Sequence, residues 1–95
     1  MARTLIHPGE ILSDELAELN IAAAELARAI QVPPNRITQI ITGKRSISAD
    51  TALRLGKWFG TGPRLWLNLQ QSYELDLASR ELKDTLNKIK TRKAA

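Results

Sequence analysis

The segment that decides the fold spans residues 21–60 and reads IAAAELARAIQVPPNRITQIITGKRSISADTALRLGKWFG. An alanine-rich amphipathic stretch ends at Ile30, and the pair Pro33-Pro34 then interrupts the pattern. A second helical stretch ends before Gly43, and a third opens at Ser48. Two short helices joined by a tight turn, with basic residues just after the second, are typical of a helix-turn-helix, which binds duplex DNA.

Residues that start or stop helices set the expected boundaries. Proline fixes φ and lacks an amide donor, so it is tolerated mainly in the first turn of a helix. Asn20, Gly43 and Gly60 suit helix ends, and Ser48 suits an N-cap. These signals predict helices over about residues 8–19, 23–30, 34–42 and 49–59 and from 63 onward. No strand signal stands out, so the fold class is all-α.

Apolar spacing predicts which residues of these helices face the core. In the stretch 23–30, Leu26, Ala29 and Ile30 are expected to turn inward, with Ala27 close to a crossing helix. In the stretch 34–42 the expected buried stripe is Ile37, Ile40 and Ile41.

The apolar pattern of the last helix continues far beyond the globular part. It starts at Leu65 and persists through Leu82 and Ile89. The chain is therefore expected to form a helix-turn-helix DNA-binding domain over residues 1–78 and a basic helical extension over residues 79–95.

Composition narrows the functional class. Ninety-five residues with 43% apolar content can build one modest core. The absence of cysteine excludes disulfides and thiolate metal sites and agrees with a cytoplasmic location. No apolar run approaches the ~20 residues that span a bilayer, and residues 1–8 lack the apolar region of a signal peptide. We therefore expect no membrane partner.

Charge is distributed in blocks along the chain. Residues 1–27 carry a net −4, residues 28–64 a net +6, residues 65–79 a net −2 and residues 80–95 a net +4. The basic block coincides with the expected helix-turn-helix. A phosphate-binding surface has this electrostatic character.

Four side chains on the outer face of the second helix of the motif are candidates for reading bases: Asn35, Arg36, Thr38 and Gln39. Asn and Gln can bond bidentately to adenine, and Arg36 matches either guanine or a phosphate. The alternative is an ordinary solvated face. Candidates for phosphate contacts follow directly, at Thr42, Lys44, Arg45 and Ser46. Here the alternatives are that Thr42 caps the helix end and that the cations complement the helix dipole.

Other polar and aromatic residues favour structural roles. His7 is the only histidine, too few for a metal site, and is interpreted as a helix-start residue. No nucleophile motif is present, so no catalytic residue, cofactor or metal is expected. Trp58, Phe59, Trp66 and Tyr73 have helical spacing, which favours core and interface positions over a ligand box. Arg54 has Asp50 one turn before it, so an ion pair competes with a DNA contact.

The order of several motifs resembles a known family. The motifs are His7-Pro8-Gly9-Glu10-Ile11-Leu12, Glu25-Leu26-Ala27, Val32-Pro33-Pro34-Asn35-Arg36-Ile37, Gly43 through Leu55, and Trp66-Leu67-Asn68-Leu69-Gln70. Together they are similar to the HigA-type antitoxins of the Xre/Cro-like class, related to phage repressors. The resemblance implies a five-helix, phage-repressor-like operator-binding protein that neutralises a RelE/HigB-like ribonuclease toxin and represses its own operon.

The chain departs from the family pattern at one place. Such proteins often begin the first helix of the motif with Ser or Thr followed by Gln, which bind the DNA. Ala22 and Ala23 occupy these positions here and offer no side-chain hydrogen bond. Only backbone amides could meet a phosphate there.

Two further surfaces are expected to bind protein. An apolar surplus at Trp66, Leu69, Tyr73, Leu82 and Leu86 predicts a homodimer interface. Glu10, Asp14, Glu15 and Glu18 predict an acidic ridge for a basic toxin, although they could equally serve solubility and the helix dipole. Two other functions stay open: a stand-alone regulator without a toxin, and a protein-interaction module that no longer binds DNA.

Overall fold

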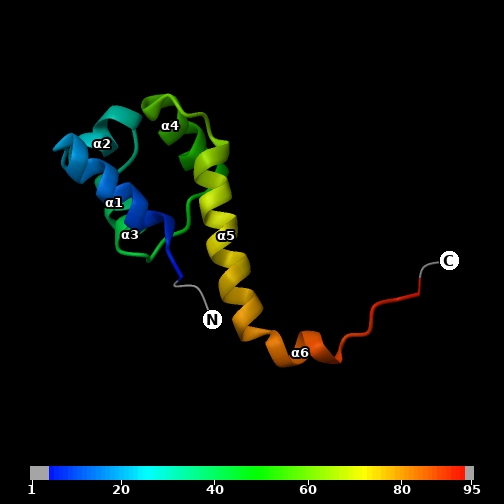
Figure 1. Cartoon of the computed structure of the whole chain (residues 1–95). Helices are drawn as coiled ribbons and strands as arrows, with labels where there is room; N and C mark the ends of the chain where they lie inside the picture. Colours follow the sequence, from blue (N-terminus) through cyan, green and yellow to red (C-terminus); the bar gives the residue numbers. More distant parts are fainter. Residues whose placement is uncertain (1–4, 94–95) are drawn as a thin grey trace.

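The protein is an assembly of helices in two parts, a globular body and a projecting arm (Figure 1). The structure is a computed structural model that describes residues 5–93. Throughout this range every regular element is helical, which confirms the all-α class. The helices are α1 (Pro8–Leu19), α2 (Ala23–Ile30), α3 (Pro34–Ile41), α4 (Ala49–Phe59), α5 (Arg64–Glu81) and α6 (Lys83–Lys88).

Local capping chemistry fixes the ends of α1. His7 is the N-cap: its Nδ1 accepts a hydrogen bond from the Gly9 amide at 2.9 Å. In return, Glu10 Oε2 accepts from the His7 amide at 3.0 Å, which completes a capping box. Asn20 ends the helix in the left-handed region at φ 55°. The interpretation of His7 as a helix-start residue is confirmed.

The pair α2 and α3 forms the helix-turn-helix. Gln31 ends α2 in the left-handed region at φ 63°, and α3 begins three residues later at Pro34. Ala22 precedes α2 without any side-chain cap. Ala27 is fully buried, as expected. Ala29 is exposed, so the prediction that it turns inward was wrong. Ala29 instead lines an open pocket together with Leu53 and Trp58 of α4.

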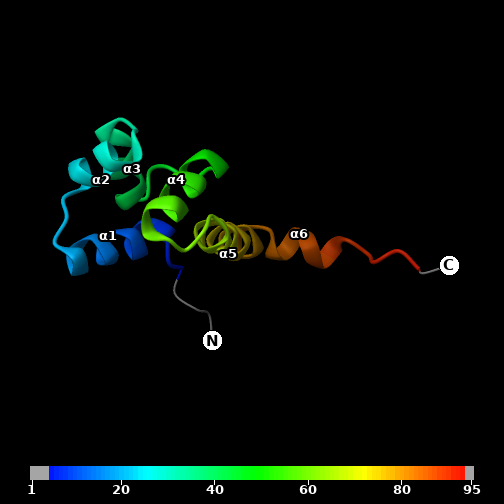
Figure 2. The ribbon, with the colours of Figure 1, turned by 90° about the horizontal axis from the view of Figure 1, so that it is seen from above.

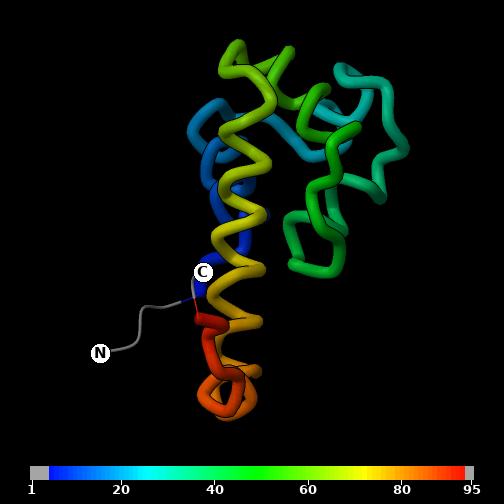
Figure 3. The backbone as a smooth tube through the Cα atoms, turned by 90° about the vertical axis from the view of Figure 1, so that its right-hand side faces the viewer, coloured from blue at the N-terminus to red at the C-terminus, as the bar shows by residue number. Residues whose placement is uncertain are grey.

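A single core joins α1 to α5. Its buried apolar residues are Leu12, Leu16, Leu26, Ala27, Ile30, Val32, Ile37, Ile40, Ile47, Ala52, Leu55 and Trp66. Each of the larger side chains contributes about 1.5–3 kcal/mol on burial. The first turns of α5 close this core, and α1 lies beside α5 (Figure 3).

The C-terminal half of α5 leaves the body, and α6 continues the arm outward (Figure 2). The molecule is accordingly elongated, with extents of 52 × 30 × 21 Å. The uninterrupted helix expected through Ile89 is divided: α5 ends at Glu81, Leu82 lies between the two helices, and α6 begins at Lys83. No residue of α6 is buried, so no packing energy holds the two segments in one straight helix.

None of the helices described within residues 5–93 is long and apolar enough to cross a membrane.

Candidate DNA-binding surface

The outer face of α3 is polar and uncovered. Ile37 and Ile40 are completely buried and Ile41 partly, which confirms the expected stripe. On the opposite side Asn35 and Thr38 are exposed, and Arg36 and Gln39 are half-buried. All four candidate base-reading residues therefore share one accessible face of one rigid helix.

The threonine hydroxyls on this face bond to the helix backbone. Thr38 Oγ1 donates to the Asn35 carbonyl at 3.2 Å. Thr42 Oγ1 donates to the carbonyls of Thr38 at 2.9 Å and Gln39 at 3.3 Å. Thr42 thus has the helix-end role that the sequence left as an alternative.

The loop after α3 is held in place from two sides. Gly43 adopts φ 79°, and the amides of Lys44 and Arg45 both donate to the Gln39 carbonyl, at 2.8 and 3.2 Å. The buried Ile47 amide donates to Gln70 Oε1 of α5 at 2.8 Å. These bonds make the loop that carries Lys44 and Arg45 a fixed part of the surface.

Gln70 is a buried polar residue whose support of this loop was not predicted from the sequence. It is 4% exposed, and besides accepting from Ile47 it donates through Nε2 to Glu74 Oε1 at 3.2 Å. Ser46 Oγ also donates to this carboxylate, at 3.5 Å. The sequence offered one signal for this role: Gln70 lies four residues, or about one helical turn, after Trp66, on the apolar side of the helix.

An ion network connects α3 with α4 and α2. Asp50 Oδ1 accepts from Arg54 Nε at 2.7 Å and from Arg36 Nη1 at 3.2 Å. Arg54 Nη1 also donates to the Ile30 carbonyl at 2.8 Å and to that of Gln31 at 3.2 Å, at the end of α2. The hydrogen bond from Arg54 leads the effects that lower the pKa of Asp50, and Arg36 adds to it. The Arg54–Asp50 pair, which the sequence left as one of two alternatives, is present, whereas the Arg36 contact was not foreseen.

Like Arg36, Gln39 on the outer face of α3 has a charged partner. Arg45 Nε donates to Gln39 Oε1 at 2.9 Å. Arg36 and Gln39 are therefore both oriented by neighbours outside α3.

Trp66 lies in the core and Phe59 packs against it, but Trp58 is 36% exposed and is not part of the core, contrary to the expectation of a core position. Trp66 is 1% exposed and packs near Phe59, with ring centroids 5.3 Å apart. Tyr73 is half-buried and meets the His7 ring edge-on at 4.9 Å. Trp66 is thus enclosed by its own chain and offers no surface for a dimer interface, contrary to the expectation. Leu82 and Leu86, by contrast, are about half exposed on the arm.

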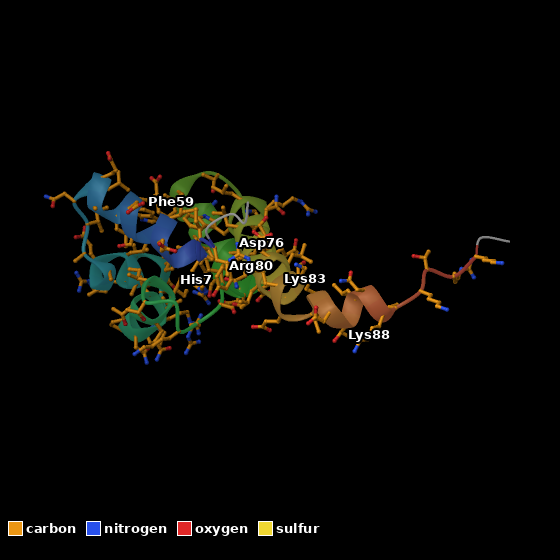
Figure 4. All side chains as sticks on the ribbon, turned by 60° about the horizontal axis from the view of Figure 1, so that its bottom comes forward. His7, Phe59, Asp76, Arg80, Lys83 and Lys88 are labelled. Carbon is orange, nitrogen blue, oxygen red and sulfur yellow. The ribbon has the colours of Figure 1, made fainter. Side chains whose placement is uncertain are left out.

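The arm carries cations as well as leucines. Lys83 lies at the start of α6, next to the end of α5, and Lys88 lies at the end of α6, farther out along the arm (Figure 4). Asp76 and Arg80 lie on the C-terminal half of α5, nearer to His7 (Figure 4).

The acidic residues of α1 are all exposed: Glu10, Asp14, Glu15 and Glu18. Glu15 also borders an apolar cleft of about 340 Å³ between α1, the α4–α5 turn and α5. Ile11, Phe59, Leu65 and Leu69 supply the apolar walls of this cleft.

His7 has a structural environment rather than a catalytic one. Burial lowers the pKa of its imidazole, and the nearby Glu10 carboxylate opposes this effect. The neutral ring is the form that can accept the Gly9 amide at Nδ1. Across residues 5–93 no three His, Asp or Glu side chains converge as a metal site would require.

Comparison with known proteins places these features in a family. A family model described as helix-turn-helix matches residues 12–66. Virulence-associated protein I of Dichelobacter nodosus is 46% identical over 83 residues, covering 86% of this chain and 76% of that protein.

Two solved structures match nearly the whole chain. An addiction module antidote protein of the HigA family from Coxiella burnetii has 47% identity and a TM-score of 0.91, covering 96% of this chain and all of that one. Pseudomonas aeruginosa antitoxin HigA, solved with the higBA promoter, has 43% identity and a TM-score of 0.88, covering 92% and 97%. The chain belongs to the HigA-type antitoxins of the helix-turn-helix family.

Proposed function

We propose that this protein is a homodimeric, cytoplasmic antitoxin that binds its operator through α3, represses its own operon and neutralises a RelE/HigB-like ribonuclease. The observation that carries the DNA-binding part is the uncovered polar face of α3 above a buried isoleucine stripe. The related HigA from Pseudomonas aeruginosa, solved with promoter DNA, supports the same conclusion. The helix-turn-helix family to which this chain belongs is a family of DNA-binding regulators and not of enzymes.

We assign two kinds of contact to this surface. Asn35, Arg36, Thr38 and Gln39 would meet base edges when α3 enters the major groove. The following residues, Thr42, Lys44, Arg45 and Ser46, would lie near the backbone. Thr42 and Ser46 already donate their hydroxyl protons within the protein, so Lys44 and Arg45 carry the main electrostatic attraction.

Lys44→Ala should weaken binding to every DNA sequence by a similar factor. Lys44 is exposed in a loop that backbone bonds already fix, so its removal deletes one charge without moving α3. The slope of log affinity against log salt should become flatter by about one unit per protomer. Fluorescence anisotropy on operator and random duplexes measures both quantities. Loss on the operator alone would contradict a phosphate role.

We propose that the dimer forms along the outer stripe of the arm. Leu75, Ala78, Leu82 and Leu86 follow one another at intervals of three or four residues, and Leu75 is 67% exposed. This stripe replaces Trp66, Leu69 and Tyr73 of the interface expected from sequence and keeps Leu82 and Leu86. Two-fold symmetry would then present two α3 helices to successive major grooves about 34 Å apart.

We propose that the toxin binds the acidic ridge of α1, formed by Glu10, Asp14, Glu15 and Glu18. A ribonuclease needs a basic surface for its substrate, and four exposed carboxylates would attract that surface. The apolar cleft beside Glu15 would supply contact area that charges alone do not.

Changing Asp14, Glu15 and Glu18 together to lysine should slow association with the toxin by about tenfold or more at low salt. The product of the adjacent reading frame is the toxin to use, and its co-purification with the wild-type protein separates an antitoxin from a stand-alone regulator. Operator binding by the free dimer should change little. An unchanged association rate at low salt would place the toxin site elsewhere.

A further inference from the structure

A charged neighbour fixes the orientation of the Gln39 side chain. Arg45 Nε donates to Gln39 Oε1 at 2.9 Å. A guanidinium group has five N–H donors and no acceptor, so only the amide oxygen can face it. The amide NH₂ of Gln39 is therefore turned away from Arg45.

The backbone holds Arg45 in this position independently of the side-chain bond. The amides of Lys44 and Arg45 both donate to the Gln39 carbonyl, which folds the loop back onto the end of α3. Two residues later, Ile47 is tied to the buried Gln70 of α5. Arg45 thus approaches Gln39 from a fixed loop and not from a mobile one.

The chemistry of the pair differs from that of glutamine alone. A free glutamine offers one acceptor and one donor side by side, which matches the N6 amino group and N7 of adenine. With its oxygen bound to Arg45, Gln39 offers mainly its NH₂ donors, and Arg45 adds the rest of its N–H groups. Guanine presents two acceptors, O6 and N7, in the major groove, whereas the amino group of adenine would face other donors.

We propose that Gln39 and Arg45 read one guanine as a unit, with Arg45 as the positioning residue that selects guanine over adenine. This inference rests on the proposed operator-binding role of α3. It gives Arg45 a part in sequence choice, beyond the phosphate contact that its place in the loop suggests.

This inference is tested by selecting binding sites from a pool of randomised duplexes. The proteins to compare are wild type, Gln39→Ala, Arg45→Ala and the control Lys44→Ala. Lys44 is the matched control because it carries the same charge as Arg45 in the same loop. Both side chains are exposed, so their alanine variants should fold. Wild type should select guanine at one position of each half-site, and Gln39→Ala should relax that position. Arg45→Ala should lower the preference for guanine over adenine there by about tenfold or more, whereas Lys44→Ala should preserve it.

Three results would overturn the inference. Arg45→Ala could lower affinity equally for all sequences, as a pure phosphate contact would. Wild type could select adenine at the position that Gln39→Ala relaxes. Finally, wild type could select no sequence at all, and only this last outcome would also overturn the proposed operator-binding function.

Discussion

Gly9→Ala should destabilise the protein by about 3 kcal/mol or more, the largest stability effect we expect from adding a single methyl group. A Cβ at residue 9 would overlap the backbone carbonyl of Ile40, at the place where α1 crosses α3. Backbone in a helix cannot move aside as a flexible side chain can, so the two helices must separate. About 1 kcal/mol lowers the melting temperature of a domain this size by roughly 4–8 °C, so a drop of about 12 °C or more is expected.

Gly60→Ala is the matched control for this experiment. Gly60 has φ 76°, which alanine tolerates poorly, but open space surrounds the added carbon. Its cost should be about 1 kcal/mol. Thermal melts measure both variants. If their melting temperatures lie within a few degrees of each other, the close approach of α1 to α3 is absent.

Leu75→Lys combined with Leu82→Lys should convert the dimer into monomers and lower operator affinity by about 100-fold or more. Both leucines lie on the exposed stripe of the arm, and neither contributes to the core of its own chain. A dimer that has engaged one half-site binds the second at a high effective concentration, and a monomer loses this gain. Sedimentation velocity reports the assembly state, and anisotropy reports the affinity.

Leu53→Lys controls for the charge that the double change adds. Leu53 is 60% exposed on α4, close to the 67% of Leu75, but lies away from the arm. It should leave the dimer intact. A double variant that still sediments as a dimer would move the interface to another surface.

The element boundaries could be predicted because local chemistry sets them. Pro8 and Asn20 delimit α1, and Ser48 and Gly60 delimit α4, through caps that involve only near neighbours in sequence. Periodicity likewise identified the outer face of α3. The end of α5 at Glu81 was not predictable, because the apolar spacing continues past it into α6, where no residue is buried.

Contacts between distant segments were the part that sequence could not supply. Spacing indicated that Trp66 is apolar and inward, but whether its own core or a partner covers it depends on how α5 crosses α4. The burial of Gln70 and the Arg36–Asp50 pair, 14 residues apart, arise in the same way. The sequence could name the candidate site residues, therefore, but not the neighbours that orient them.

We propose that this protein recognises a specific operator as a dimer. The most direct test of this proposal is the anisotropy of wild-type protein on a duplex from upstream of its own coding region and on a scrambled duplex of equal length, at several salt concentrations. We predict binding to the upstream duplex about 10³-fold tighter or more, with affinity for both duplexes falling as salt rises. Equal affinity for the two duplexes at every salt concentration would contradict the account.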